Sequence, residues 1–195
     1  MAQNEPLSLR RYLSRSEAIA RRYFVVNGFD GALTMLGMLA GFYLGGDVDT
    51  GIVIRACAGA AVALGVSGFS SAYLSESAER RHALSKLEHA MMSELSDTAQ
   101  GNAVRFISGF VALANGLAPV LMAVIIITPL WLDHTGVPLP LAPLPAAMAT
   151  ALFLIFLLGV LIGRIGGTTW WRSGLKTAAI ALITLVLIIL LGGRV

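Results

Sequence analysis

The stretch Tyr23–Gly45, YFVVNGFDGALTMLGMLAGFYLG, decides how the rest of the chain is interpreted. It is apolar and long enough to cross a bilayer, because about 20 residues at about 1.5 Å per residue span the hydrocarbon core. One carboxylate, Asp30, lies about two helical turns into it, with Asn27 one turn before and Thr34 one turn after. An ionisable group at that depth costs several kcal/mol unless it is paired, hydrated or bound to an ion. Asp30 is the only acidic residue inside any apolar segment of the sequence, so we expect it to be functional.

The composition is that of an integral membrane protein. Of 195 residues, 56% are hydrophobic and 13% are charged, whereas soluble domains carry roughly 25% charged residues. The first twenty residues contain arginines and no apolar core, so no cleavable signal peptide is expected. The single cysteine, Cys57, excludes an intrachain disulfide. We interpret the net charge of +3 as a topology signal and expect no nucleic-acid partner.

Hydropathy predicts an all-α polytopic membrane protein with five transmembrane helices and a short cytoplasmic helical linker between the second and the third. The apolar segments are 23–45, 52–75, 104–131, 142–163 and 177–192. The chain accordingly divides into an N-terminal cytoplasmic segment, helices 1 and 2, an acidic helical segment, and helices 3 to 5, with bounds 1–22, 23–75, 76–103 and 104–195. Residues 1–22 are equally consistent with an amphipathic helix on the inner leaflet and with a disordered tail.

The basic residues set the expected orientation. Of the 14 lysines and arginines, all but Arg55 and Arg194 precede the first span or lie between spans 2 and 3 or 4 and 5. The positive-inside rule makes that side cytoplasmic. We therefore expect a multi-pass plasma-membrane protein with its N-terminus in the cytoplasm and its C-terminus outside.

The polar segment after the second span, ESAERRHALSKLEHAMMSELSD (76–97), contains good helix formers and neither glycine nor proline. It is expected to continue or follow the second span as a helix. At 100° per residue, Glu76, Glu79 and His82 lie within about 120° of arc. Carboxylate and imidazole side chains at i, i+3 spacing suit Fe(II), Mn(II) or Zn(II).

A third carboxylate in this segment, Glu88, lies nearly opposite Glu79 on one straight helix. It would join the first group only through a helix break or a second subunit. The alternative interpretation is a solvated helix face with ion pairs, of which Glu76 and Arg80 are an i, i+4 example.

Glycines recur at four-residue spacing in the first span, at Gly37, Gly41 and Gly45. Such spacing permits close helix–helix approach and favours a tight pairing of the first two spans, within the chain or across a dimer. The same residues are also suited to lining a narrow pathway.

Two motifs resemble the vacuolar iron transporter family. The segment 27–34, NGFDGALT, is similar to the DG-x-x-T/S stretch of that family's first helix, and 65–75, GVSGFSSAYLS, is similar to the end of its second helix. The acidic linker occupies the place of the family's cytoplasmic metal-binding domain and is much shorter. Gly68 and Ala72 stand where the family has a methionine and an acidic residue. The likeness covers roughly residues 21–130.

The resemblance implies a homodimeric, non-enzymatic transporter that exports Fe²⁺, or Mn²⁺, from the cytoplasm in exchange for protons, with no tightly bound cofactor. Asp30 of each copy would face a central pathway, and cytoplasmic carboxylates would collect the ion. The implied metal ligands are Asp30, Glu76, Glu79, His82 and Glu88, and the implied pathway residues are Asn27, Thr34, Ser67 and Asn115.

Two other classes remain open at the level of sequence. One is a membrane-anchored di-iron oxidase, although such sites need carboxylates and histidines from four helices. The other is an assembly subunit that transports nothing, which would leave Asp30 unexplained. Asn115 is equally consistent with a helix-packing role.

Overall fold

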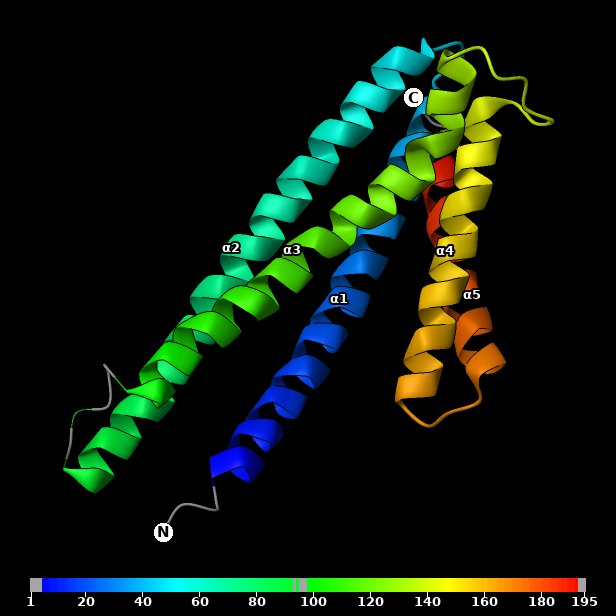
Figure 1. Ribbon diagram of the computed structural model, residues 1–195. Coiled ribbons are helices and arrows are strands. Elements are labelled where there is room, and N and C mark those ends of the chain that lie inside the picture. Colours follow the sequence, from blue (N-terminus) through cyan, green and yellow to red (C-terminus); the bar gives the residue numbers. More distant parts are fainter. Residues whose placement is uncertain (1–4, 93, 95–97, 193–195) are drawn as a thin grey trace. The chain divides into compact units, whose positions relative to one another are not determined.

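The computed structural model describes residues 5–92, 94 and 98–192, and in this part of the chain all regular structure is helical (Figure 1). The helices are α1 (Glu5–Leu44), α2 (Thr50–Met91), α3 (Ala99–His134), α4 (Pro143–Ile165) and α5 (Trp170–Gly192). Each contains a segment long and apolar enough to cross a membrane. The all-α class and the presence of five helices long and apolar enough to span a membrane are therefore confirmed.

Two compact units make up the chain, and α1, α2 and α3 each run through both. Unit 1 comprises Met1–Phe24 and Gly65–Leu117, and unit 2 comprises Val25–Leu64 and Ala118–Val195. Unit 1 contains the lower-hydropathy ends of the long helices. Unit 2 contains Asp30 and the complete helices α4 and α5.

Unit 1 is held together by small apolar side chains and one buried amide. Ala20, Ile107 and Val111 form its buried cluster. The Asn115 side-chain amide of α3 donates a 2.8 Å hydrogen bond to the Gly68 carbonyl of α2. The next residue, Gly116, packs so tightly that a Cβ there would stand 2.8 Å from the Gly65 carbonyl oxygen. Helices α2 and α3 therefore approach with their backbones nearly in contact.

The core of unit 2 lies between α1, α2, α3 and α4. Its largest fully buried side chains include Met35, Leu36, Val53, Ile126 and Ile155. These are large apolar residues contributed by four different helices, as expected for the inward faces of a helical bundle.

Helices α4 and α5 form a tight antiparallel hairpin built on small residues. Gly159 lies against Thr177 and Gly174, and Gly163 lies against Ser173. The Thr177 hydroxyl donates to the Ile155 carbonyl of α4 at 3.1 Å. Missing side chains at these glycines let the two backbones approach closely, which is the general mode of helix association in membranes.

Contacts at the helix ends in unit 2 are consistent with successive helices that run in alternating directions. The Thr50 hydroxyl at the start of α2 donates to Asp133 at the end of α3, at 3.4 Å. A Cβ at Gly192, the end of α5, would stand 3.3 Å from the Leu44 side chain at the end of α1. The ends of α1, α3 and α5 and the start of α2 thus lie together.

Three helix boundaries refine the sequence prediction. Helix α2 runs without interruption from its span into the polar segment as far as Met91, so that segment continues the second span. Helix α1 begins at Glu5, so residues 5–22 belong to the same helix as the first span. Helix α5 begins at Trp170 and not at residue 177, because the intervening tryptophan, arginine and lysine side chains are polar enough to lower hydropathy without disfavouring a helix. Arg194 lies outside the described residues.

Candidate functional site

The polar residues of the first span share one face of α1. At 100° per residue, Asn27, Asp30 and Thr34 lie within about 60° of arc. Asp30 and Thr34 are exposed and Asn27 is half-buried. The Thr34 hydroxyl donates to the Asp30 backbone carbonyl at 2.8 Å, which directs its remaining lone pairs away from the helix backbone.

The opposite face of α1 is buried in unit 2 and fixes how the helix is rotated. A Cβ added at Gly31 would stand 2.7 Å from both Cα and Cβ of Pro119 on α3. Such a close approach is possible only for glycine, so Gly31 is the crossing point of α1 and α3. Asp30 precedes it by one residue, or about 100° of rotation. The crossing therefore turns the Asp30 carboxylate away from α3 and out of the core of unit 2.

Glycines extend the exposed face of α1 beyond Thr34. Gly37, Gly41 and Gly45 lie on the same stripe as Asp30. Among the described residues, a Cβ at Gly41 would meet no atom within 4 Å, and one at Gly37 would meet only the tip of Ile188, at 3.5 Å. The backbone approaches below 3 Å are made at other glycines, such as Gly31 and Gly116, so the four-residue pattern does not mark a tight helix contact within the described residues.

Arg55, the basic residue of the apolar segment 52–75, lies near the start of α2, far along the helix direction from Asp30. Its Nη1 and the Asp49 carboxylate stand 3.4 and 2.9 Å from the position of a Cβ at Gly51, in the first turn of α2. That turn follows the end of α1, and Leu44 is about 21 Å along the helix from Asp30. A direct ion pair between Asp30 and Arg55 is excluded by this spacing.

The candidate ligands on the polar part of α2 point in different directions. Glu76 is buried, with 7% exposure, and its carboxylate forms a 3.1 Å ion pair with Arg80. Glu79 and His82 are exposed. The Glu76–Arg80 pair expected from the i, i+4 spacing is present, and a metal bound by Glu76 would have to compete with that guanidinium.

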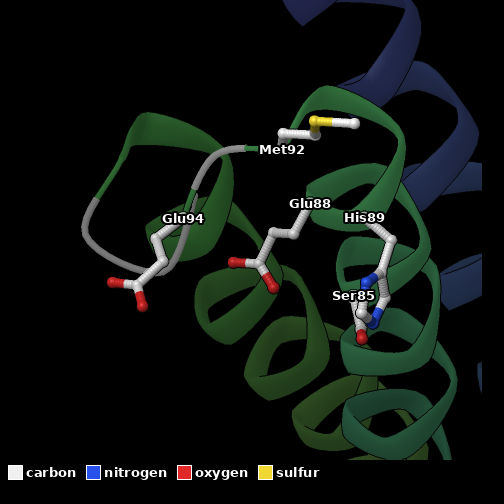
Figure 2. Close-up of a pocket in the computed structure, with 5 residues that line it drawn as sticks. All are labelled: Ser85, Glu88, His89, Met92 and Glu94. Atoms are coloured by element: carbon white, nitrogen blue, oxygen red, sulfur yellow. The ribbon is translucent and has the colours of Figure 1, made fainter.

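Glu88 lies farther along α2, at the rim of an open depression of about 330 Å³. Ser85, His89, Met92 and Glu94 complete its lining (Figure 2). Figure 2 shows the Glu88 and Glu94 carboxylates on one side of the depression and the His89 ring beside Ser85. Met92 directly follows the end of α2 at Met91 and adopts a left-handed conformation (φ 49°).

The depression contains residues that sequence reasoning did not group. Helical spacing relates Glu88 to Ser85 and Met92, whereas Glu94 lies beyond the end of α2, where helical periodicity no longer predicts its neighbours. Among the described residues, no three His, Cys, Asp or Glu side chains lie close enough together to hold a metal ion. The metal-ligand role of Glu76, Glu79, His82 and Glu88 stays a prediction.

The other predicted pathway residues have contrasting environments. Ser67 is exposed on α2, whereas Asn115 is buried at 6% exposure and engaged with Gly68. Asn115 thus makes a contact between α2 and α3, in agreement with the helix-packing role that the sequence left open.

Comparisons with known proteins add one relative. The chain is similar to an uncharacterised protein of Methanocaldococcus jannaschii, 25% identical over 189 residues, which cover 93% of this chain and 94% of the relative. No family model matches the chain, and no solved structure matches it. The similarity extends over all five helices but assigns no activity.

Proposed function

We propose that this chain is a divalent transition-metal transporter that exports Fe²⁺, or Mn²⁺, from the cytoplasm in exchange for protons. The observation that carries the proposal is the position of Asp30, an exposed carboxylate within an apolar span, on a face of α1 that unit 2 leaves open. A carboxylate in that setting needs a compensating cation, water or hydrogen-bond donor.

An exchange mechanism follows from the chemistry of the carboxylate. Its oxygens bind hard and borderline divalent cations, and they also bind protons. A metal ion and a proton therefore compete for the same oxygens, which is the minimal requirement for coupling their fluxes in opposite directions. Asn27 and Thr34, within one helical turn on either side, offer neutral oxygens of the kind that accompany carboxylates in cation sites.

A homodimer would complete the pathway. Two α1 helices facing each other would place two Asp30 carboxylates on one axis, and the absence of a side chain at the exposed Gly41 would allow a close approach. A divalent cation between two carboxylates is neutralised, whereas a single carboxylate would leave a net positive charge in the bilayer. The charge bias of the sequence supports a cytoplasmic position for the acidic end of α2, where exposed Glu79, His82 and the Glu88 depression would attract the ion before transport.

The decisive experiment is metal uptake into inverted proteoliposomes that contain an internal pH dye. The wild-type protein is expected to take up Fe²⁺ or Mn²⁺ with proton release from the lumen, and Asp30→Asn is expected to abolish both. Thr34→Val is expected to reduce the rate, whereas Thr128→Val is the matched control. Thr128 is also exposed and also donates to the carbonyl four residues earlier, at 2.9 Å, but on α3.

Two results would refute the proposal. One is the absence of metal-dependent flux from folded wild-type protein. The other is full activity of Asp30→Asn.

A further inference from the structure

We propose that the turn between α4 and α5 is a binding surface for anionic phospholipid headgroups. The basic–aromatic turn, as we name it, consists of Arg164, Trp170, Trp171, Arg172 and Lys176. All five side chains are exposed, and the two indoles are about half exposed, at 51% and 48%. This inference does not depend on the proposed transport function.

The turn itself is fixed by hydrogen bonds, so these side chains are presented on an ordered backbone. Gly167 adopts φ +64°, and the Thr168 amide donates to the Gly163 carbonyl at 2.9 Å. The Thr168 and Ser173 hydroxyls are 3.0 Å apart and tie the turn to the first turn of α5. Because the backbone of the turn is already ordered, binding of a ligand there would cost little backbone conformational entropy.

The tryptophans place the turn at the depth of the lipid headgroups. Helix α5 has 23 residues, which correspond to about 34 Å and match the hydrocarbon core with little excess. Trp170 and Trp171 lie at its first turn, where indole rings prefer the membrane interface. Leu175 follows Trp171 by one turn and is 58% exposed, so that face continues into the acyl region.

The charges on this surface have no acidic counterpart in the hairpin. Asp133 is the last acidic residue of the sequence, so all of α4, the turn and α5 carry basic groups alone. Arg172 and Lys176 share a face by their i, i+4 spacing, and the Arg172 guanidinium lies 5.5 Å from the centre of the Trp171 ring. Lys176, one turn deeper, can extend its ammonium toward the interface. Lipid phosphates are the anions available at this depth, and each basic residue near a membrane surface adds attraction for them.

The test is fluorescence quenching by brominated lipids in bilayers that contain the full-length protein. A Trp131→Phe background leaves Trp170 and Trp171 as the reporters, because the sequence has three tryptophans. Quenching in mixed vesicles of brominated phosphatidylglycerol and phosphatidylcholine gives the relative affinity of the turn for the two lipids. Because the relative affinity is a ratio of two quenching measurements on the same protein, changes in the fluorescence quantum yield of the tryptophans cancel.

We expect the Trp131→Phe protein to prefer phosphatidylglycerol and Arg172→Gln/Lys176→Gln to lose that preference. The expected loss is about fivefold per basic residue, or on the order of 30-fold for the pair. The matched control is Arg81→Gln/Lys86→Gln, which removes the same charge from exposed positions on the polar part of α2. High salt should weaken the preference of the parent protein.

An equal loss in both double variants would overturn the inference, because it would indicate a response to net charge. Equal quenching by the two lipids in the Trp131→Phe protein would also overturn it. Inorganic phosphate should leave the preference largely intact at ionic strength matched with chloride. If inorganic phosphate at matched ionic strength abolished the preference for phosphatidylglycerol, the site would bind free phosphate, and the proposal of a lipid-binding surface would be refuted.

Discussion

Replacement of Gly31 by alanine tests the helix crossing that orients Asp30. The added Cβ would stand 2.7 Å from Pro119 Cα and Cβ, whereas carbon atoms pack at about 3.5–4.0 Å. The obstructing atoms belong to backbone and to a proline ring, so neither can move aside by rotating a side chain. Helices α1 and α3 must separate by about 1 Å at their crossing, and overpacking of this kind costs about 1–3 kcal/mol.

Gly28→Ala provides a matched control for this substitution. Gly28 is also buried on α1, three residues earlier, but a Cβ there would meet the side chains of Met122 and Ala118 at 3.6 and 3.8 Å, which is ordinary contact. Both substitutions gain the same helix propensity, about 1 kcal/mol. The difference between the two variants therefore isolates the crossing, and Gly31→Ala should be less stable than Gly28→Ala by about 1–3 kcal/mol.

The assay is thermal or chemical unfolding of the two variants in the same detergent, followed by circular dichroism. In proteoliposomes, Gly31→Ala should also reduce metal flux, because the displaced crossing moves Asp30. If Gly31→Ala proves as stable as Gly28→Ala, α1 and α3 do not cross in the way described, and the argument for the direction of Asp30 fails with it.

Two further predictions concern helix contacts. Asn115→Leu removes the buried 2.8 Å hydrogen bond to Gly68 and should lower the free energy of unfolding by about 0.6 kcal/mol, and by at most about 2; an unchanged or raised stability would contradict this role. In a Cys57→Ser background, oxidation should cross-link Gly41→Cys into covalent dimers, since disulfides form only where two Cα atoms approach within about 7 Å. Leu182→Cys, 53% exposed on α5, should remain monomeric, and the reverse pattern on non-reducing gels would refute the α1 dimer.

Hydropathy was sufficient to predict the helices, because five apolar segments in a chain with few charges have few alternatives. The apolar segment 177–192 is shorter than the helix that contains it, because α5 already begins at Trp170. Interfacial tryptophans and basic residues lower the hydropathy of a helix end without breaking the helix. Sequence patterns of this kind report burial in lipid more directly than they report helical conformation.

Helix-to-helix contacts were much less predictable than the helices themselves. The four-residue glycine spacing at Gly37, Gly41 and Gly45 predicted a close pairing within the chain or across a dimer. Among the described residues, a Cβ at Gly41 would meet no atom within 4 Å, whereas one at Gly31 would stand 2.7 Å from Pro119. Periodicity identifies which residues share a face. Which residue of another helix meets that face depends on crossing angle and register, and neither is encoded in the spacing within one helix.

The same limit applies to the acidic residues of α2. Glu76 and Glu79 lie within one turn, and the sequence allowed both to bind one ion. The structure buries Glu76 beside Arg80 and leaves Glu79 exposed. A three-residue spacing separates two side chains by about 60°, which is enough to place one of them inside unit 1 and the other outside it.

The two faces of α1 connect packing with the proposed function. The face that carries Gly28 and Gly31 is buried within unit 2, and the face that carries Asp30 and Gly41 is exposed. Because residues 30 and 31 are joined covalently in one helix, the contact of Gly31 with Pro119 also determines the direction of the Asp30 carboxylate. An exposed carboxylate within an apolar span costs several kcal/mol unless it is paired, hydrated or bound to an ion. In the proposed transporter, a second copy of α1 or a bound cation with its water would remove that cost, so the exposure of Asp30 is the feature that the proposed assembly explains.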